Sequence, residues 1–378
     1  MKLIYSLKKR TFLEIFSEIP GLAIQIRQKK TSWVVWFLFL GVIPGVAGGG
    51  GIVGSAAQAG HMLLPLISEN LWVIIICLLT WLILYWGSYK SLEKVLLLMV
   101  ITFSVITLII SIVMQTTEYQ VNIDQILYGL TFDFKLEYLA LAIAVYGYTG
   151  INFGEIMAYT YWCLEKGYAK EAGNKNEGIK SWIKVMQTDV WTTLLLMTIG
   201  TLPFFFLGAG VLNQLPAEIT SELTFDDIIP RLIYMFTEVM GDWAKWIFLI
   251  GAFFVLFSTV LSGTAGFTRT IPDYLITTGL VEEKETSRKS LLKKVALAVP
   301  LASALIYFFY PHPVNLLLIA GIWAALSLPL VNAVAIYLAN QLDPSLQPKK
   351  STKMFLWTTL ILQIFLALLI VFNQAIGF

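Results

Sequence analysis

Nine long apolar stretches constrain the fold of this chain more than any other feature. They lie at residues 33–64, 71–88, 95–114, 138–163, 183–209, 243–268, 295–310, 314–339 and 354–376. About 20 apolar residues in a helix cross the hydrocarbon core of a bilayer. The chain is 57% hydrophobic and 13% charged, whereas soluble domains are roughly 25% charged. We therefore predict an all-α integral membrane protein with one transmembrane domain, residues 32–378, after an N-terminal segment, residues 1–31.

The distribution of basic residues predicts how the chain is oriented. If the nine stretches cross in turn, all of the 26 Lys and Arg residues except Lys135, Arg231 and Lys245 fall on one side. Because basic residues are concentrated in cytoplasmic loops, we expect the N-terminus, including residues 1–31, in the cytoplasm and the C-terminus outside. The net charge of +2 does not suggest nucleic-acid binding.

Two segments are predicted to depart from a simple transmembrane helix. The first apolar stretch exceeds one crossing, so we expect it to tilt or to kink near Pro44. Its glycines, in GVAGGGGIVGSAAQAGH, lack the Lys-Ser/Thr of a phosphate loop and favour close helix packing. Outside the membrane, residues 223–240 predict a short interfacial helix that begins at Asp226 or Asp227 and has an apolar side of Ile228, Leu232, Ile233 and Phe236.

The stretch AVYGYTGINFGEIMAYTYWCLEKGY, residues 144–168, places polar residues within an apolar span. Three glycines between Gly147 and Gly154 disfavour a continuous helix, and an interruption in lipid survives only where protein or water satisfies the backbone. Carbonyls at Gly147 and Gly150, the Asn152 amide and the Glu155 carboxylate would form an oxygen-rich cluster, which suits hard divalent cations. The alternative is structural: the glycines permit close packing, and Glu155 faces water or pairs with a neighbour.

Other polar residues in the spans are weaker candidates for a transport path. Gln187 and Asp189 lie near the cytoplasmic end of the fifth stretch, where Asp189 is equally well explained as a structural acid. Ser258 and Ser262 either line a path or bond between helices. His61 is a candidate for the outer vestibule and Arg269 for the cytoplasmic mouth. No Ser/His/Asp or Cys/His arrangement indicates an enzyme, and neither Cys77 nor Cys163 has the spacing of a disulfide or thiolate site.

Several motifs resemble one family of transporters. YTYWCLEKGYAKEAG, SWIKVMQTDVWTTLLLMTIGTLPFFFLGAGVL, GSYKSLEKVLLLMVITFSVITLI, GAFFVLFSTVLSGTAGFTRTIPDYL and LIAGIWAALSLPLVNAVAIYLAN are similar to segments of the Nramp-related divalent metal transporters. The resemblance begins near Thr11 and extends to the end. It implies a LeuT-like fold of two inverted repeats, in which the nine stretches correspond to helices 3–11 and residues 144–168 to the broken sixth helix.

Two departures from the family pattern limit what the resemblance implies. Helices 1 and 2 have no counterpart, so the acid and amide that helix 1 contributes are missing from this sequence. The Met-Pro-His motif of helix 6 is also absent. Met157 lies nearby without the Pro and His, and an oxygen site at Asn152 and Glu155 favours Mg²⁺ or another hard ion over Mn²⁺ or Fe²⁺.

These observations lead to a functional expectation with two alternatives. We expect a secondary transporter of divalent cations (Mn, Fe or Mg class) in a bacterial inner membrane, with no cofactor, and with coupling to protons left open. A second polypeptide would supply helices 1 and 2, unless the sequence is truncated at its N-terminus. One alternative is an accessory or degenerate membrane protein without transport activity. The other is a transporter of a small organic solute such as an amino acid, because the N-termini of half-helices could bind its carboxylate.

Overall fold

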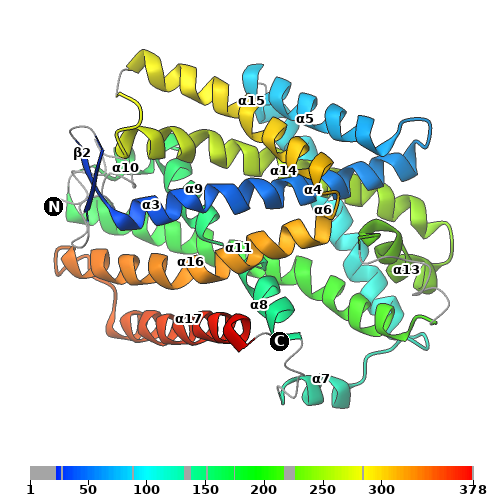
Figure 1. Cartoon of the computed structure of the whole chain (residues 1–378). Coiled ribbons are helices and arrows are strands. Elements are labelled where there is room, and N and C mark those ends of the chain that lie inside the picture. Colours follow the sequence, from blue (N-terminus) through cyan, green and yellow to red (C-terminus); the bar gives the residue numbers. More distant parts are fainter. Residues whose placement is uncertain are drawn as a thin grey trace.

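Long helices that run side by side make up most of the protein (Figure 1). The computed structural model describes residues 23–26, 29–86, 89–131, 138–149, 152–173, 175–216, 226–282 and 285–376. The longer helices are α3 Trp33–Leu40 with α4 Val42–Leu63, α5 Glu69–Trp86, α6 Tyr89–Met114, α8 Leu139–Tyr148 with α9 Phe153–Glu165, α11 Asn176–Gly210, α14 Ala244–Thr277, α15 Glu285–Phe309, α16 Pro313–Gln341 and α17 Lys350–Ile376.

Within these described residues, nine helical segments are long and apolar enough to cross a membrane. The predicted all-α architecture with nine spans is therefore confirmed. The helices α11 and α14 extend well past the predicted limits, because a helix continues through charged residues at which an apolar stretch ends. The helix α11 includes Lys180 and Lys184, and α14 continues beyond Arg269 to Thr277.

The first span is interrupted close to Pro44. Helical hydrogen bonding stops at Gly41, between α3 and α4. Proline lacks the N–H that would bond the carbonyl four residues earlier, and its ring crowds that carbonyl. The residue in question is Leu40, the last residue of α3. The interruption is thus where the sequence predicts a kink.

The glycines of α4 bring neighbouring helices close to its backbone. A Cβ atom added at Gly54 would lie 2.1 Å from the Tyr307 ring of α15, and one at Gly51 would lie 2.6 Å from the Pro313 carbonyl of α16. The helix α4 also packs against α14. The close packing predicted from these small residues is therefore present, and it makes α4 a central helix of the bundle.

The helix after the fifth span begins at one of the two predicted positions and buries its predicted apolar side. It is α13, Ile228–Met240, and residues 217–225 lie outside the described part of the chain. Asp227 occupies the N-cap position without a side-chain capping bond. Ile229, Ile233 and Phe236 are buried against α6 and α14, and the Phe236 ring stacks on Phe103 with centroids 5.9 Å apart. The predicted apolar side of the helix therefore packs into the bundle, and its position at the membrane interface stays a prediction.

A β-hairpin that the sequence did not predict precedes the first span. Strand β1, Ala23–Ile26, pairs antiparallel with β2, Lys29–Ser32, with Ala23 opposite Ser32. The Thr31 hydroxyl donates to the Thr277 carbonyl at 3.0 Å and so links β2 to the end of α14.

The two ends of the bundle differ in charge. The end with β2 and the short helix α10, Tyr168–Ala172, lies at the left of Figure 1 and also carries Lys166, Lys170 and Lys175. We call it the basic end. The helix α13 lies at the opposite end, together with the 310 turn η2, Leu212–Gln214; the short helix α7, Ile123–Gly129, follows α6.

Candidate functional site

The fourth span is broken between α8 and α9. The helix α8 ends at Tyr148, Thr149 is extended, and α9 begins at Phe153 with Asn152 as its N-cap. Gly150 and Ile151 lie outside the described residues. The interruption predicted from the glycines of this stretch is therefore present, although the placement of Gly150 in the proposed site stays a prediction.

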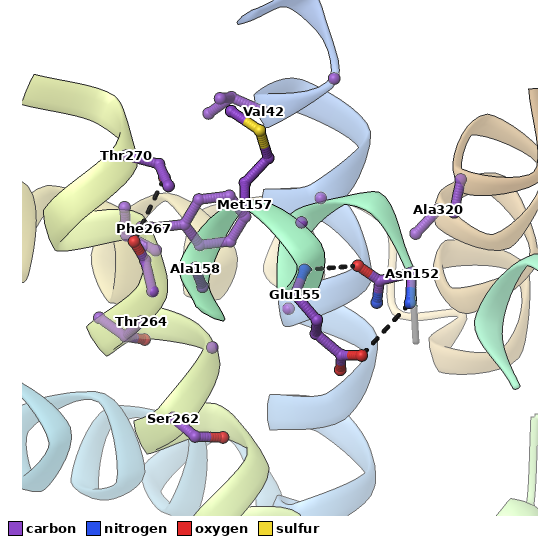
Figure 2. A pocket seen from close by; sticks show the side chains of 18 of the residues that line it. Val42, Asn152, Glu155, Met157, Ala158, Ser262, Thr264, Phe267, Thr270 and Ala320 are labelled. Carbon is purple, nitrogen blue, oxygen red and sulfur yellow. Dashed lines mark hydrogen bonds between the residues drawn. The ribbon is translucent and has the colours of Figure 1, made fainter. Parts of the chain in front are cut away.

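Asn152 and Glu155 form a capping box at the start of α9. The Asn152 side-chain oxygen accepts a hydrogen bond from the Glu155 N–H at 3.2 Å, and the Asn152 N–H donates to Glu155 Oε2 at 3.3 Å (Figure 2). Such a box satisfies two backbone donors that a helix start leaves unpaired. Part of the polarity at this break thus has a local structural cause.

A cavity of about 260 Å³ lies beside this helix start. Residues from α4, α9, α14, α15 and α16 line it. Its polar lining includes Asn152, Glu155, Thr259, Ser262, Thr264, Thr270 and Ser303. Among the described residues that line the cavity, Glu155 is the one with an ionisable carboxylate.

Glu155 presents an accessible carboxyl group at this position. Its side chain is exposed, as are Thr259 and Gly263 across the cavity on α14, and Ser262 is half-buried. The capping bond uses Oε2, and among the described residues no hydrogen bond to Oε1 is found. A carboxylate within a membrane span is costly unless a partner or ligand compensates it. Glu155 Oε1 is therefore the group in the cavity best suited to bind a cation.

Met157 does not contribute its sulfur to the Glu155 side of the cavity. Figure 2 shows its side chain extending toward Val42 while the Glu155 carboxylate points the opposite way. Met157 is buried among Val34, Leu38 and Tyr274. The ligands presented beside Glu155 are therefore oxygens.

Gly147 has a packing role. A Cβ atom added there would lie 1.9 Å from the Gly321 carbonyl oxygen and 2.7 Å from the Ala325 nitrogen of α16. Gly147 is buried and does not belong to the cavity lining. Its position matches the alternative reading of the glycines, in which they permit close helix packing.

The two candidates on α11, the Gln187 amide and the Asp189 carboxylate, do not line the cavity. Gln187 is exposed. The Asp189 carboxylate accepts hydrogen bonds from the Tyr168 hydroxyl at 3.0 Å and from the Tyr159 hydroxyl at 3.5 Å. Asp189 thus has the hydrogen-bonded structural surroundings that were one of its two readings.

The remaining candidates divide between local bonding and the cavity. Ser258 donates to the Val255 carbonyl at 2.7 Å, whereas Ser262 donates to Thr259 at 3.2 Å and also lines the cavity. His61 Nδ1 lies 2.8 Å from the Ile67 carbonyl oxygen. Arg269 binds Glu165. Of the predicted residues, the structure thus brings Asn152, Glu155 and Ser262 together.

Sequence reasoning missed how the helices bind one another around the cavity. Asp273 of α14 accepts from the Tyr161 hydroxyl of α9 at 2.5 Å and pairs with Arg288 of α15 at 2.8 Å. At the opposite end, His312 Nδ1 lies 2.5 Å from the Asp226 carboxylate. The repeated spacing of four residues, Tyr161 with Glu165 and Arg269 with Asp273, was the one available signal.

The described residues do not by themselves complete a metal site. Among them, no group of three or more His, Cys, Asp or Glu residues is close enough to hold a metal ion. Asn152 and Glu155 supply side-chain oxygens from one helix start, and hard cations such as Mg²⁺ and Ca²⁺ take six or more ligands. Further ligands must come from water, from backbone carbonyls or from another segment.

Comparison with known proteins gives two matches. A family profile described as "Natural resistance-associated macrophage protein-like" (Nramp) matches residues 20–373. An uncharacterized protein of Pasteurella multocida (strain Pm70) is 31% identical over 119 residues, which are 31% of this chain and 27% of that protein. The second match thus spans little more than a quarter of the relative, whereas the family profile covers nearly all of this chain.

Proposed function

Because the chain belongs to the Nramp family of metal ion transporters, we propose that it forms the membrane core of a secondary transporter of divalent cations. The observation that carries this proposal is the broken span, whose second half begins with Asn152 and Glu155 on the wall of a cavity. Secondary transporters bind ions near the middle of the membrane at discontinuous helices. Transport by alternating access follows from the LeuT-like repeats that family membership implies.

The proposed ligands are Asn152 and Glu155, with a backbone carbonyl near Gly150, while Gly147 is left with its packing role. Glu155 Oε1 would bind the ion directly, and the Asn152 carbonyl oxygen would be available once it exchanges its capping bond for the cation. Because these ligands are hard oxygens and the Met157 sulfur points away, we propose a preference for Mg²⁺ or another hard ion over Mn²⁺ or Fe²⁺.

The exposure of Glu155 supports a second part of the proposal. We propose that two further helices, from the same protein or from a second polypeptide, cover the cavity and provide the missing ligands. An exposed carboxylate and hydroxyls at membrane depth are unfavourable in lipid. Covering them would remove this cost and complete the coordination of the ion.

We also propose a bacterial inner-membrane location with the basic end in the cytoplasm. The Lys and Arg distribution supports this orientation through the positive-inside rule. It places the N-terminus inside and the C-terminus outside. Cysteine substitutions at Lys170 and Glu118, which lie at opposite ends, would report the orientation through reagents that do not cross the membrane.

Uptake into proteoliposomes tests the proposed ion site. The complete protein, with any partner that co-purifies, should take up Mn²⁺ or Mg²⁺, and Glu155→Gln should lower uptake at least about tenfold because one charged ligand is lost. Gln at this position still accepts the capping bond, so the fold is preserved. Glu118→Gln is the matched control, since Glu118 is exposed and outside the cavity. Unchanged uptake in Glu155→Gln would remove Glu155 from the site.

A pH-sensitive dye in the same vesicles measures whether protons accompany the ion.

A small organic solute is the second candidate, and one observation favours it. The indole N–H of Trp323, a residue that lines the cavity, is buried and has no hydrogen-bond partner among the described residues. A carboxylate can accept from such a donor, whereas a metal ion cannot. Calorimetry with amino acids and with Mn²⁺ separates the two. Binding of an amino acid without binding of Mn²⁺ would favour the organic solute, and binding of neither would favour an accessory protein without transport activity.

A further inference from the structure

Two polar links join α9 to α14 next to the cavity. The first is an ion pair with two contacts, in which Arg269 Nε lies 2.8 Å from Glu165 Oε1 and the second guanidinium nitrogen lies 3.1 Å from Oε2. The side chains of Arg269 and Glu165 are 27% and 53% exposed. Paired contacts of this kind fix the relative orientation of both groups.

The second link is buried and includes a third helix. The Asp273 side chain, only 3% exposed, accepts from the Tyr161 hydroxyl of α9 and pairs with Arg288 of α15. Each carboxylate oxygen of Asp273 therefore has a partner from a different helix. A buried carboxylate that loses a partner is strongly unfavourable. Movement of α9 away from α14 would take the Tyr161 hydroxyl from Asp273, so this link holds α9 in place.

Both links lie where the cavity ends toward the basic end. On α9 the last lining residue is Trp162, next to Tyr161. On α14 the last lining residues are Thr270 and Tyr274, next to Arg269 and Asp273. The linking residues themselves are not part of the lining. Together they close the gap between α9 and α14 at this boundary.

The chain connections at the two ends of α9 are not helical. Its 13 residues begin after the break at Thr149–Asn152. They end before Gly167, whose positive φ of 82° belongs to the left-handed region. Neither end of α9 continues directly into another helix, so rotation at these two connections does not require a helix to bend.

We propose that the Glu165–Arg269 pair and the Tyr161–Asp273–Arg288 cluster form a latch that closes the cavity toward the basic end. Separation of the two links lets α9 move away from α14 and opens the cavity on that side. The role of the latch in transport rests on the proposed alternating access. The structural alternative is that both links are permanent and α9 never leaves α14.

A native cysteine makes the latch testable without measuring transport. Cys163 lies on α9 between Tyr161 and Glu165 and is 9% exposed. The chain contains 2 cysteines, so Cys77→Ser leaves Cys163 as the single thiol, while the new hydroxyl still donates to the Pro300 carbonyl as Cys77 does. The rate of reaction with a small thiol reagent then reports how often α9 exposes Cys163.

The purified complete protein in nanodiscs is the sample for this experiment. In the Cys77→Ser background, Glu165→Gln and Arg269→Gln should each raise the modification rate about threefold, the size expected for a partly exposed ion pair. Asp273→Asn should raise it about tenfold or more, because the buried cluster loses its charge. The exchanged pair Glu165→Arg with Arg269→Glu should return the rate to within about twofold of the parent. The matched control is Lys170→Gln with Glu171→Gln on α10, which should leave the rate unchanged.

The melting temperature distinguishes a latch that opens from permanent links that only stabilise the fold. For a latch, Glu165→Gln raises the rate while the melting temperature stays near that of the parent, because only α9 opens. Unchanged rates in both single variants would overturn the proposal, as would failure of the exchanged pair to restore the rate. Should Asp273→Asn fail to fold, the more exposed Glu165–Arg269 pair decides the result. Because the readout needs no ion flux, a latch that operates in a protein without uptake would contradict only the proposed transport function.

Discussion

The two halves of the broken span are held in different ways. The helix α8 contacts α16 through backbone, because Gly147 and Gly321 have no side chains and a Cβ atom at either position would meet carbonyl oxygen at 1.9 Å and 2.3 Å. The helix α9 is held on α14 by polar side chains at its end and faces a cavity along its length. Backbone packing has one geometry, whereas side-chain links can separate and reform. With the latch proposed above, α8 is the fixed half and α9 the movable half of one span.

The largest expected effect comes from disturbing the fixed half. Gly147→Ala should lower the free energy of unfolding by about 3 kcal/mol, because the added methyl group must displace the α16 backbone. Thermal unfolding in detergent measures this loss. Gly200→Ala on α11 is the control. The nearest atom to its added Cβ is the Ser104 hydroxyl oxygen at 3.8 Å, so it should be neutral or slightly stabilising through helix propensity. Equal stability of the two variants would show that α8 and α16 are not in close contact.

A smaller effect is expected from removing the cap of the movable half. Asn152→Ala should cost about 1 kcal/mol, the typical value for loss of an N-cap, and should speed amide hydrogen exchange in α9 while α8 stays protected. Asn122→Ala is matched, because Asn122 and Gln125 form the same kind of box at the start of α7. It should affect α7 alone. Faster exchange in α8 after Asn152→Ala would mean that the two halves open together.

The smallest effect is a pH dependence in α10, the short helix that follows the movable half. The hydrogen bond to the Asp189 carboxylate raises the pKa of Tyr168, which follows α9 in the chain. A raised pKa means that the protonated hydroxyl stabilises the fold below its ordinary pKa of about 10, and that this contribution is lost as the pH rises through the raised value. We expect hydrogen exchange around α10 to gain extra acceleration above about pH 10, beyond the intrinsic increase with pH. Tyr168→Phe should remove that extra acceleration, and α8 should not show it.

The spans and the break could be predicted because both depend on local composition. Apolar length locates the nine spans, and the glycines with Asn152 locate the interruption. The limits of α11 and α14 were set too narrowly, since their charged ends remain helical. The apolar side of α13 was predicted, but its packing partners could not be, because Phe103 and Phe248 are distant from it in the sequence.

The partners of the candidate site residues were also beyond the sequence. The spacing places Tyr161 and Glu165 on one face of a helix, but it does not reveal that α14 lies opposite with Arg269 and Asp273. The same applies to Asp189, which bonds Tyr168 across a turn between helices. Gly147 shows the converse case, because its glycine was compatible with both ion binding and packing, and only the position of Gly321 favours packing.

The capping box at Asn152 and Glu155 has a consequence for measured affinity. At the proposed site, a cation that took both oxygens of the Glu155 carboxylate would withdraw the acceptor of the Asn152 N–H, so its binding would loosen the first turn of α9. The loss of a cap is worth about 1 kcal/mol, which lowers the apparent affinity about fivefold relative to a carboxylate with no second duty. The same competition would make the first turn of α9 less ordered when the ion is bound, so the order of this helix start would report whether the site is occupied.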